Sequence, residues 1–223
     1  AKVCAGGKTP AGTHRPIMVK EILDVLAPQP GEVAMDCTLG YGGHARELLA
    51  AVQPGGRLLA TDADPIELPK TESRLRSLGF GPEALFARRM NCAGVAQWIA
   101  AESPGGVDLL LADLGASSMQ IDDPARGFTF KTDGPLDMRM NPARGLSASA
   151  LLSRIDESRL AQILADNADE PQAEDLARQI LHVHRRSPLT TTRSLADVVS
   201  AAWRKFPHHG SGTAEAAIRR VFQ

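Results

Sequence analysis

The chain has 223 residues, enough for one large or two small domains around a buried core. Hydrophobic residues make up 43% and charged residues 23%, as in ordinary globular proteins. The formal net charge of −1 excludes a global field that would draw the protein onto nucleic acid or an anionic membrane. Any RNA or DNA partner must therefore be held by a local basic patch.

Three cysteines, Cys4, Cys37 and Cys92, form no C-x-x-C pair. This pattern argues against a disulfide framework and against a zinc site, and it predicts a reducing, cytoplasmic environment, with an organellar one left open. No apolar run approaches the length of a membrane span, so no membrane partner is expected.

In chain order, the apolar spacing predicts a helix over about 17–26 and a strand at 33–36, and then alternating helices and strands. The further strands are expected at 58–62, 84–87 and 107–112, and the helices between them at about 44–52, 65–78 and 95–101. This alternation predicts an α/β fold with a parallel, Rossmann-like sheet. Residues 123–145 have no steady period, whereas residues 147–204 and 214–223 are helical in pattern.

The turn after the first strand carries the strongest local signal. Asp36 ends the strand, Gly40, Gly42 and Gly43 follow within a few residues, and a helix then begins. Such a turn brings backbone N–H groups close to a ligand. The same residues fit the G-x-G-x-x-A dinucleotide fingerprint, so a nicotinamide cofactor, S-adenosylmethionine and a purely structural turn all remain open.

Three acids bear on the choice of ligand. Asp36 before the glycines favours an S-adenosylmethionine enzyme over a nicotinamide enzyme. Asp62 ends the next strand, where a carboxylate can accept both hydroxyls of an adenosine ribose. Asp113 opens a loop of small and polar residues, 113–122, at the end of the strand predicted at 107–112. Open α/β sheets bind ligands at this edge.

With these pieces placed, the chain resembles the small-subunit (16S) ribosomal RNA cytosine-N4 methyltransferases along nearly its whole length. The resemblance rests on an ordered set of blocks. These are His14-x-Pro16 with Glu21, Asp36-x-Thr38-x-Gly40-x-Gly42-Gly43-His44, Asp62-x-Asp64-Pro65, Asp113-Leu114-Gly115-x-Ser117-Ser118-x-Gln120-x-Asp122, Arg126-Gly127-Phe128-x-Phe130 and Asp133-Gly134-Pro135-Leu136-Asp137-Met138-Arg139-Met140.

The resemblance implies a methyltransferase core over 1–122, an inserted helical RNA-recognition domain over 123–206, and a return toward the core over 207–223. It implies S-adenosylmethionine as cofactor, no metal, small-subunit ribosomal RNA or the assembled subunit as partner, and a possible homodimer. The implied cofactor contacts are Gly42, Gly43, His44, Asp62, Cys92, Asp113 and Gln120.

The resemblance also implies catalytic roles for Asp113 and Asp137, and RNA contacts for Arg126, Arg139 and Arg144. Asp113 is expected to bind the cofactor amine or to accept a proton, with the first role favoured. For Asp137 and Arg139 the alternative is a salt-bridged turn with the neighbouring methionines in the core.

The chain departs from the family in three places. Cys92 stands where the family has Phe near the adenine, residues 167–178 carry acids where the family has basic residues, and the chain stops where the family continues into further helices and two strands. A catalytically inactive or truncated methyltransferase-fold binding protein is therefore the main alternative, and a nicotinamide oxidoreductase is a second.

Overall fold

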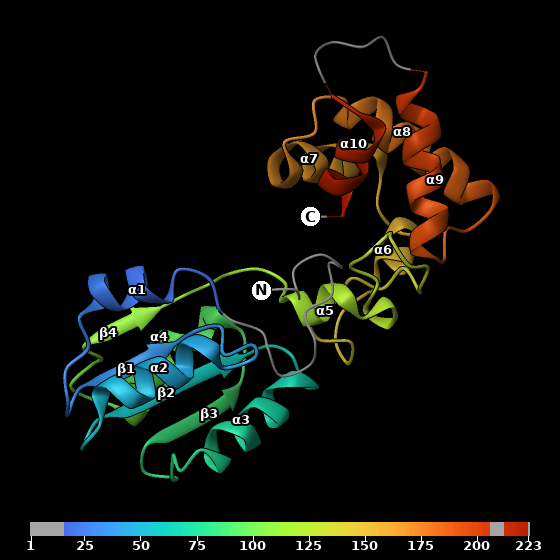
Figure 1. Ribbon diagram of the computed structural model, residues 1–223. Helices are drawn as coiled ribbons and strands as arrows, with labels where there is room; N and C mark the ends of the chain where they lie inside the picture. Colours follow the sequence, from blue (N-terminus) through green and yellow to red (C-terminus); the bar gives the residue numbers. More distant parts are fainter. Residues whose placement is uncertain (1–15, 206–211, 223) are drawn as a thin grey trace, which may run out of the picture. The chain divides into compact units, whose positions relative to one another are not determined.

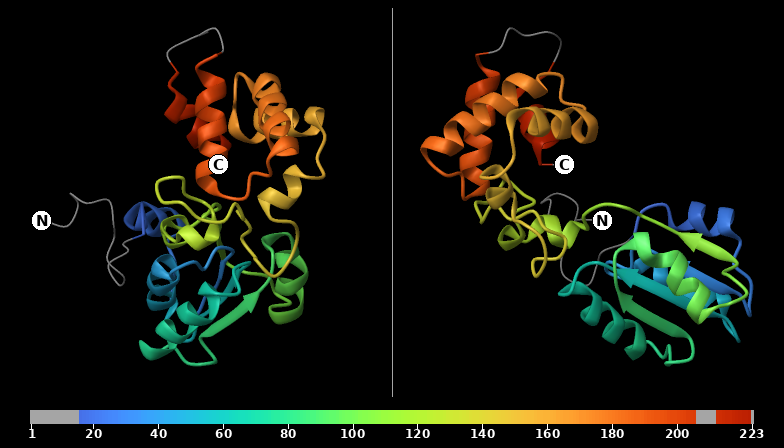
Figure 2. Two further views of the ribbon diagram at one scale, coloured as in Figure 1. Left: turned by 90° about the vertical axis from the view of Figure 1, so that its right-hand side faces the viewer. Right: turned by 180° about the vertical axis from the view of Figure 1, so that it is seen from behind.

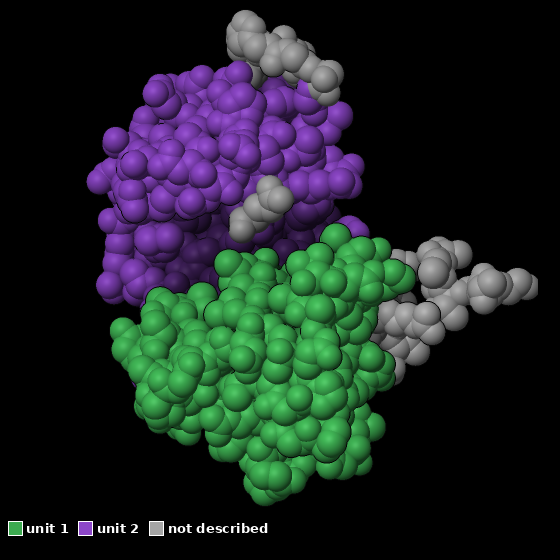
Figure 3. Space-filling model, turned by 90° about the vertical axis from the view of Figure 1, so that its left-hand side faces the viewer, with its two compact units in different colours: residues 1–117 green, residues 118–223 purple. Residues whose placement is uncertain are grey.

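The computed structural model describes residues 16–205 and 212–222. His14 of the first block and Cys4 lie outside the described residues. The chain divides into two compact units, residues 1–117 and 118–223, which Figure 3 colours separately. They are called here the sheet unit and the helical unit.

The sheet unit is built on four parallel strands (Figure 1). They are β1 (Val33–Asp36), β2 (Arg57–Asp62), β3 (Leu85–Arg89) and β4 (Leu109–Leu111). Their order is β3-β2-β1-β4, so the chain moves outward from β1 in one direction and then crosses to its other side. The prediction of a parallel α/β, Rossmann-like sheet is confirmed, and the reversal between β1 and β4 is where such sheets hold ligands.

Helices cover both faces of this sheet (Figure 2). On one face lie α1 (Val19–Leu26), α2 (Gly43–Val52) and α3 (Glu67–Ser77). Their apolar side chains share a core cluster with alternate strand residues such as Ala34 and Leu58. On the other face, α4 (Val95–Glu102) packs through Trp98 against Met35 and Leu59. Successive side chains of a strand point to opposite faces of the sheet, so each face has its own hydrophobic core.

The two edge strands differ from expectation in ways that their side chains explain. The apolar run at 107–112 predicts a strand covered on both faces. In the structure β4 has only three residues, and Leu110 is 47% exposed. β3 runs on to Arg89, beyond the expected end at 87, because Arg88 and Arg89 lie on an exposed edge where charge is tolerated.

The helical unit has its own core, which is built mainly from its last four helices. Its helices are α5 (Ser118–Asp122), α6 (Ala148–Leu152), α7 (Glu157–Ala168), α8 (Ala173–Arg186), α9 (Thr192–Trp203) and α10 (Ala214–Val221), with a short 3-10 turn at Pro124–Arg126. α7 packs on α8, α8 on α9, and α10 on both α9 and α7. Leu176, Ile180 and Val199 are almost fully buried at the centre.

Local signals set the ends of the helices within residues 147–204, the stretch in which the sequence predicted a helical pattern broken at Pro171 and Pro188. Asp169 ends α7 in a left-handed conformation, and the Asp156 carboxylate caps its start by accepting the Arg159 N–H at 2.8 Å. Thr191 and Ser194 form a capping box at the start of α9.

Residues 123–145 are largely irregular, as predicted, yet they are tied to the helical unit. Leu136 is 1% exposed within the helical core, and Pro135 pairs with Thr191. α10, within the predicted return segment, packs in the same core through Ala217 and Phe222. The functional division into core, RNA-recognition domain and return segment stays a prediction. No helix in the described ranges is long and apolar enough to cross a membrane.

Candidate functional site at the carboxyl edge of the sheet

Asp36 sits at the end of β1 and is almost completely buried, with 1% of its surface exposed. Its carboxylate accepts hydrogen bonds from the Thr38 N–H at 2.9 Å and the Thr38 hydroxyl at 3.4 Å. Burial raises the pKa of Asp36 from 3.8 to about 6, although the Thr38 N–H and the nearby His44 work in the opposite direction. An acid with such a pKa is poised to titrate near neutral pH.

Thr38 also joins the ends of two strands. Its hydroxyl oxygen accepts the backbone N–H of Asp113 at 2.8 Å, so the loop after β4 is fixed to the turn after β1. Thr38 belongs to one of the blocks shared with the family, but no role was predicted for it from the sequence. The signal for this contact is that Thr38 follows the strand-end residue Asp36 by two positions, while Asp113 follows the neighbouring strand.

Asp62 binds the glycine turn directly. One carboxylate oxygen accepts the Gly40 N–H at 2.8 Å and the other accepts the Asp64 N–H at 2.8 Å. Burial is the largest influence on the Asp62 pKa and raises it. A carboxylate oxygen can accept a second hydrogen bond, so Asp62 retains acceptor capacity for the hydroxyls of a ligand.

The glycine turn leads into α2 with an unusual start. Gly42 is the N-cap residue in a left-handed conformation (φ +79°), and among the described residues no side chain caps this helix. A Cβ on Gly43 would lie 2.7 Å from the Pro16 ring, so the backbone of the turn runs close to the segment before α1. The first N–H groups of a helix have no partner within the helix, and such groups can bind an anionic group.

His44 and Asp113 lie beside this helix start. His44 Nε2 lies 2.8 Å from the carbonyl oxygen of Ile17, and a bond to a carbonyl requires that nitrogen to donate. Its Nδ1 lies 3.9 Å from a carboxylate oxygen of Asp113, whose side chain is 52% exposed. The Asp113 carboxylate is thus half-exposed to solvent, and the more buried His44 imidazole lies next to it.

Cys92 completes the set of predicted residues in the sheet unit. It is exposed and follows β3 in a short 3-10 turn that Asn91 caps by accepting the Ala93 N–H at 2.9 Å. Because all four strands are parallel and paired, the residues that follow them share one edge of the sheet. The structure therefore brings the glycine turn, Asp62, Cys92 and Asp113 to that edge.

The other predicted site residues belong to the helical unit. Gln120 is buried in α5 with 4% exposure. Arg139 forms a two-pronged ion pair with Asp137, at 2.8 and 2.6 Å, and this pairing lowers the pKa of Asp137. Arg126 is buried and donates to the carbonyls of residues 139 and 140, at 3.2 and 2.9 Å, whereas Arg144 is exposed.

These contacts show the salt-bridged turn that the sequence left open. Met138 adopts a left-handed φ of +61° and packs partly against the helical core. The catalytic role of Asp137 and the RNA contacts of Arg126, Arg139 and Arg144 stay predictions. Of the three arginines, only Arg144 has its side chain largely in solvent in this structure.

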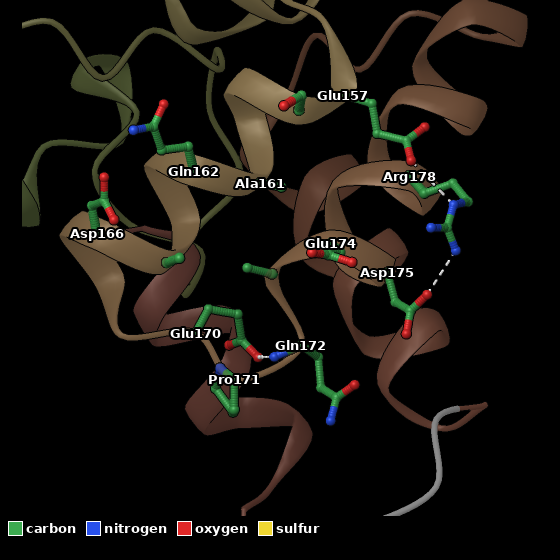
Figure 4. A pocket seen from close by; sticks show the side chains of 13 residues that line it. Glu157, Ala161, Gln162, Asp166, Glu170, Pro171, Gln172, Glu174, Asp175 and Arg178 are labelled. Carbon is green, nitrogen blue, oxygen red and sulfur yellow. Dashed lines mark hydrogen bonds and ion pairs between the residues drawn. The ribbon is translucent and has the colours of Figure 1, made fainter.

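The helical unit also contains a large acidic hollow of about 870 Å³ between α7 and the start of α8 (Figure 4). Its charged lining consists of Glu157, Asp166, Glu170, Glu174, Asp175 and Arg178. Glu170 is buried and accepts the Arg220 Nε–H at 2.7 Å, and Arg178 pairs with Glu157 and Asp175. Five carboxylates against one guanidinium repel phosphate, so this hollow is an unsuitable RNA contact.

The residues at the sheet edge fit S-adenosylmethionine in their donor chemistry. The uncapped start of α2 offers N–H groups to a carboxylate, Asp62 offers acceptors to ribose hydroxyls, and Asp113 offers an acceptor to an amine. No group of three or more His, Cys, Asp or Glu side chains within the described ranges is arranged to hold a metal ion.

Comparison with known proteins agrees with this geometry. A model of the MraW methylase family matches residues 11–223. The chain is 45% identical, over its whole length, to "Ribosomal RNA small subunit methyltransferase H 1" of Lachnoclostridium phytofermentans, and covers 61% of that protein. It is 47% identical over 94% of its length to the "H 2" protein of Alkaliphilus metalliredigens, of which it covers 60%.

A third relative, from Rubrobacter xylanophilus, is 39% identical over 96% of this chain and 64% of its own length. The chain thus spans about 60% of the length of the curated relatives it matches. The family match runs through both units, from the glycine turn to α10. This match and the arrangement of acids and glycines at the sheet edge show that the chain belongs to the MraW methylase family.

Proposed function

We propose that the chain carries the cofactor site of an S-adenosylmethionine-dependent methyltransferase that modifies the exocyclic N4 of a cytosine in small-subunit ribosomal RNA. The observation that carries the proposal is the meeting of Asp62, the uncapped start of α2 and Asp113 at one edge of the sheet. The names of the relatives support the ribosomal RNA substrate, and the resemblance noted above supports cytosine N4.

Each group has a distinct task in this proposal. S-adenosylmethionine, when bound, supplies an electrophilic methyl group on its sulfonium. Asp62 accepts the ribose hydroxyls and, through the Gly40 N–H, keeps the turn in place. The N–H groups at the start of α2 hold the carboxylate of the methionine part, and Asp113 holds its amine.

Cytosine N4 is a poor nucleophile because its lone pair is delocalised into the ring. Methyl transfer therefore depends on in-line placement of N4 and on an acceptor for the amine proton. Positioning of this kind contributes several kcal/mol to lowering a barrier. The small residues after Asp113, from Gly115 to Ser118, leave room for a base that has left its stack.

The cofactor assignment is tested by substituting Asp62. In calorimetric titrations, Asp62→Ala is expected to weaken binding of S-adenosylmethionine by about 1–3 kcal/mol, because charge-assisted hydrogen bonds to the ribose are lost. Asp108→Ala is the matched control. Asp108 also accepts a backbone N–H, that of Val33 at 2.8 Å, but it precedes β4 at the opposite edge of the sheet.

Equal affinity of the Asp62→Ala and Asp108→Ala variants would sink the ribose assignment. NADH is titrated as a second ligand. If the chain bound NADH tightly and did not bind S-adenosylmethionine, the site would be that of a nicotinamide-dependent enzyme. Transfer of a labelled methyl group to small-subunit RNA then separates the enzyme from the inactive binding protein, which would bind the cofactor without turnover. The proposed homodimer and cytoplasmic location stay predictions.

A further inference from the structure

One face of α3 packs against the glycine turn, to which Asp62 is also hydrogen-bonded. Thr71 is fully buried, and its hydroxyl donates to the Gly40 carbonyl at 2.6 Å. A Cβ on Gly42 would lie 2.6 Å from Thr71 Cγ2 and 3.4 Å from Leu75 Cδ1. The turn and the helix are therefore in direct contact over two successive glycines.

Arg74 extends this contact to the residue between those glycines. Its Nη2 donates to the Tyr41 carbonyl at 3.1 Å and to the Thr71 hydroxyl at 2.6 Å. Its guanidinium carbon lies 3.8 Å from the centroid of the Tyr41 ring, which is close stacking for a cation on an aromatic face. Arg74 thus holds Tyr41 by its backbone and by its ring.

We propose that Arg74, together with Thr71, is a positioning residue that keeps the 40–42 turn in the conformation required for cofactor binding. Both backbone polar groups of Gly40 are bound, because its N–H donates to Asp62 and its carbonyl accepts from Thr71. The next carbonyl, of Tyr41, accepts from Arg74. The inference rests on the proposed cofactor site and names residues of α3 that support it without reaching the ligand.

The physical argument is one of preorganisation. Glycines give the turn freedom to adopt several conformations, and only one of them aims the start of α2 at an anionic group. If the loss of Arg74 lowers the population of that conformation to about one tenth, the apparent affinity falls about tenfold. The spacing of Thr71, Arg74 and Leu75 at i, i+3 and i+4 places all three on the face toward the turn.

The experiment compares Arg74→Ala with Arg76→Ala. Arg76 lies two residues further along α3 and pairs with Glu72 at 2.7 Å, and it reaches the Leu85 carbonyl at 3.3 Å, so it has no contact with the turn. Arg74→Ala is expected to weaken S-adenosylmethionine binding about tenfold, whereas Arg76→Ala leaves the affinity unchanged. Arg74→Lys, which keeps a donor and a charge over the ring, is expected to recover part of the loss.

A second readout needs no cofactor. Tyr41 is the only tyrosine of the chain, so tyrosine-selective isotope labelling gives a single set of ring and amide signals. NMR relaxation of these signals is expected to show greater mobility in Arg74→Ala but not in Arg76→Ala. If Arg74→Ala fails to fold, Thr71→Val, which keeps the branched shape and removes the hydroxyl, takes its place in both measurements.

The outcomes separate the two proposals. If the unmodified chain binds S-adenosylmethionine and both alanine variants bind equally well, the positioning role is overturned and the proposed function stands. If the unmodified chain fails to bind the cofactor, the proposed function falls, and the Tyr41 relaxation data alone test whether Arg74 holds the 40–42 turn. Unchanged mobility of Tyr41 in Arg74→Ala would then overturn the positioning role as well.

Discussion

Gly42→Ala is expected to lower the free energy of unfolding of the sheet unit by about 2–5 kcal/mol. A left-handed conformation costs a residue with a Cβ about 1–2 kcal/mol, and Gly42 has φ +79°. Overpacking adds about 1–3 kcal/mol, because the new methyl would lie 2.6 Å from Thr71 Cγ2. Thr71 cannot easily move aside, since its hydroxyl is bonded to Gly40 and Arg74.

Two variants separate these causes in urea denaturation. Gly79→Ala carries the backbone cost alone, because Gly79 has φ +97° and nothing lies within 4 Å of its added Cβ. Thr71→Ser removes the crowding methyl and keeps the hydroxyl, so the double variant with Gly42→Ala is expected to regain about 1–2 kcal/mol relative to the sum of the single changes. If Gly42→Ala lowers the free energy of unfolding by no more than Gly79→Ala does, Thr71 does not crowd a Cβ at position 42.

Asp36→Asn is expected to change how the stability of the sheet unit depends on pH. In the folded chain the pKa of Asp36 is raised by burial from 3.8 to about 6, so between these values the folded state holds a proton that the unfolded state has lost. The free energy of unfolding therefore falls as the pH rises through this window, by about 3 kcal/mol in total. Well below pH 4 the Asp36 carboxyl is protonated in both the folded and the unfolded state, so it no longer contributes to the pH dependence of stability.

The variant lacks this titration. Its side-chain oxygen can still accept the Thr38 N–H, so Asp36→Asn is expected to exceed the unmodified chain in stability at pH 7.5 and to match it more closely at pH 4.5. Urea denaturation at both pH values measures the difference, and comparison of the two chains cancels the titration of all other groups. A gap that is the same at both pH values would mean that Asp36 is ionised in the folded state throughout.

The sequence predicted most of the sheet unit because its signals are local. Asp36, the three glycines and Asp62 each mark the end of a strand or the start of a helix, and parallel strands bring such ends together. The extent of β4 could not be predicted in the same way. Its exposure depends on which strands lie beside it, and in the described residues β4 pairs with β1 alone.

The supporting contacts of the site were harder to predict. Thr71 and Arg74 follow Asp62 by nine and twelve residues, in a helix whose register against the glycine turn is set by tertiary packing. The choice between an ion-paired turn and an RNA contact at Asp137 and Arg139 likewise required coordinates, because alternating charges and methionines in sequence fit both. The helical stripes in 147–204 identified the helices but not their ends, which caps such as Thr191 determine.

The two units have separate hydrophobic cores, and each unit buries one of the two tryptophans of the chain. Trp98 is 4% exposed in the core of the sheet unit and Trp203 is 9% exposed in that of the helical unit. Each indole therefore reports on the melting of its own unit, and Trp203→Phe leaves Trp98, in the unit that contains the glycine turn, as the sole tryptophan of the chain. Emission from the unmodified chain can follow two transitions, so a single midpoint fitted to it would average units that need not unfold together.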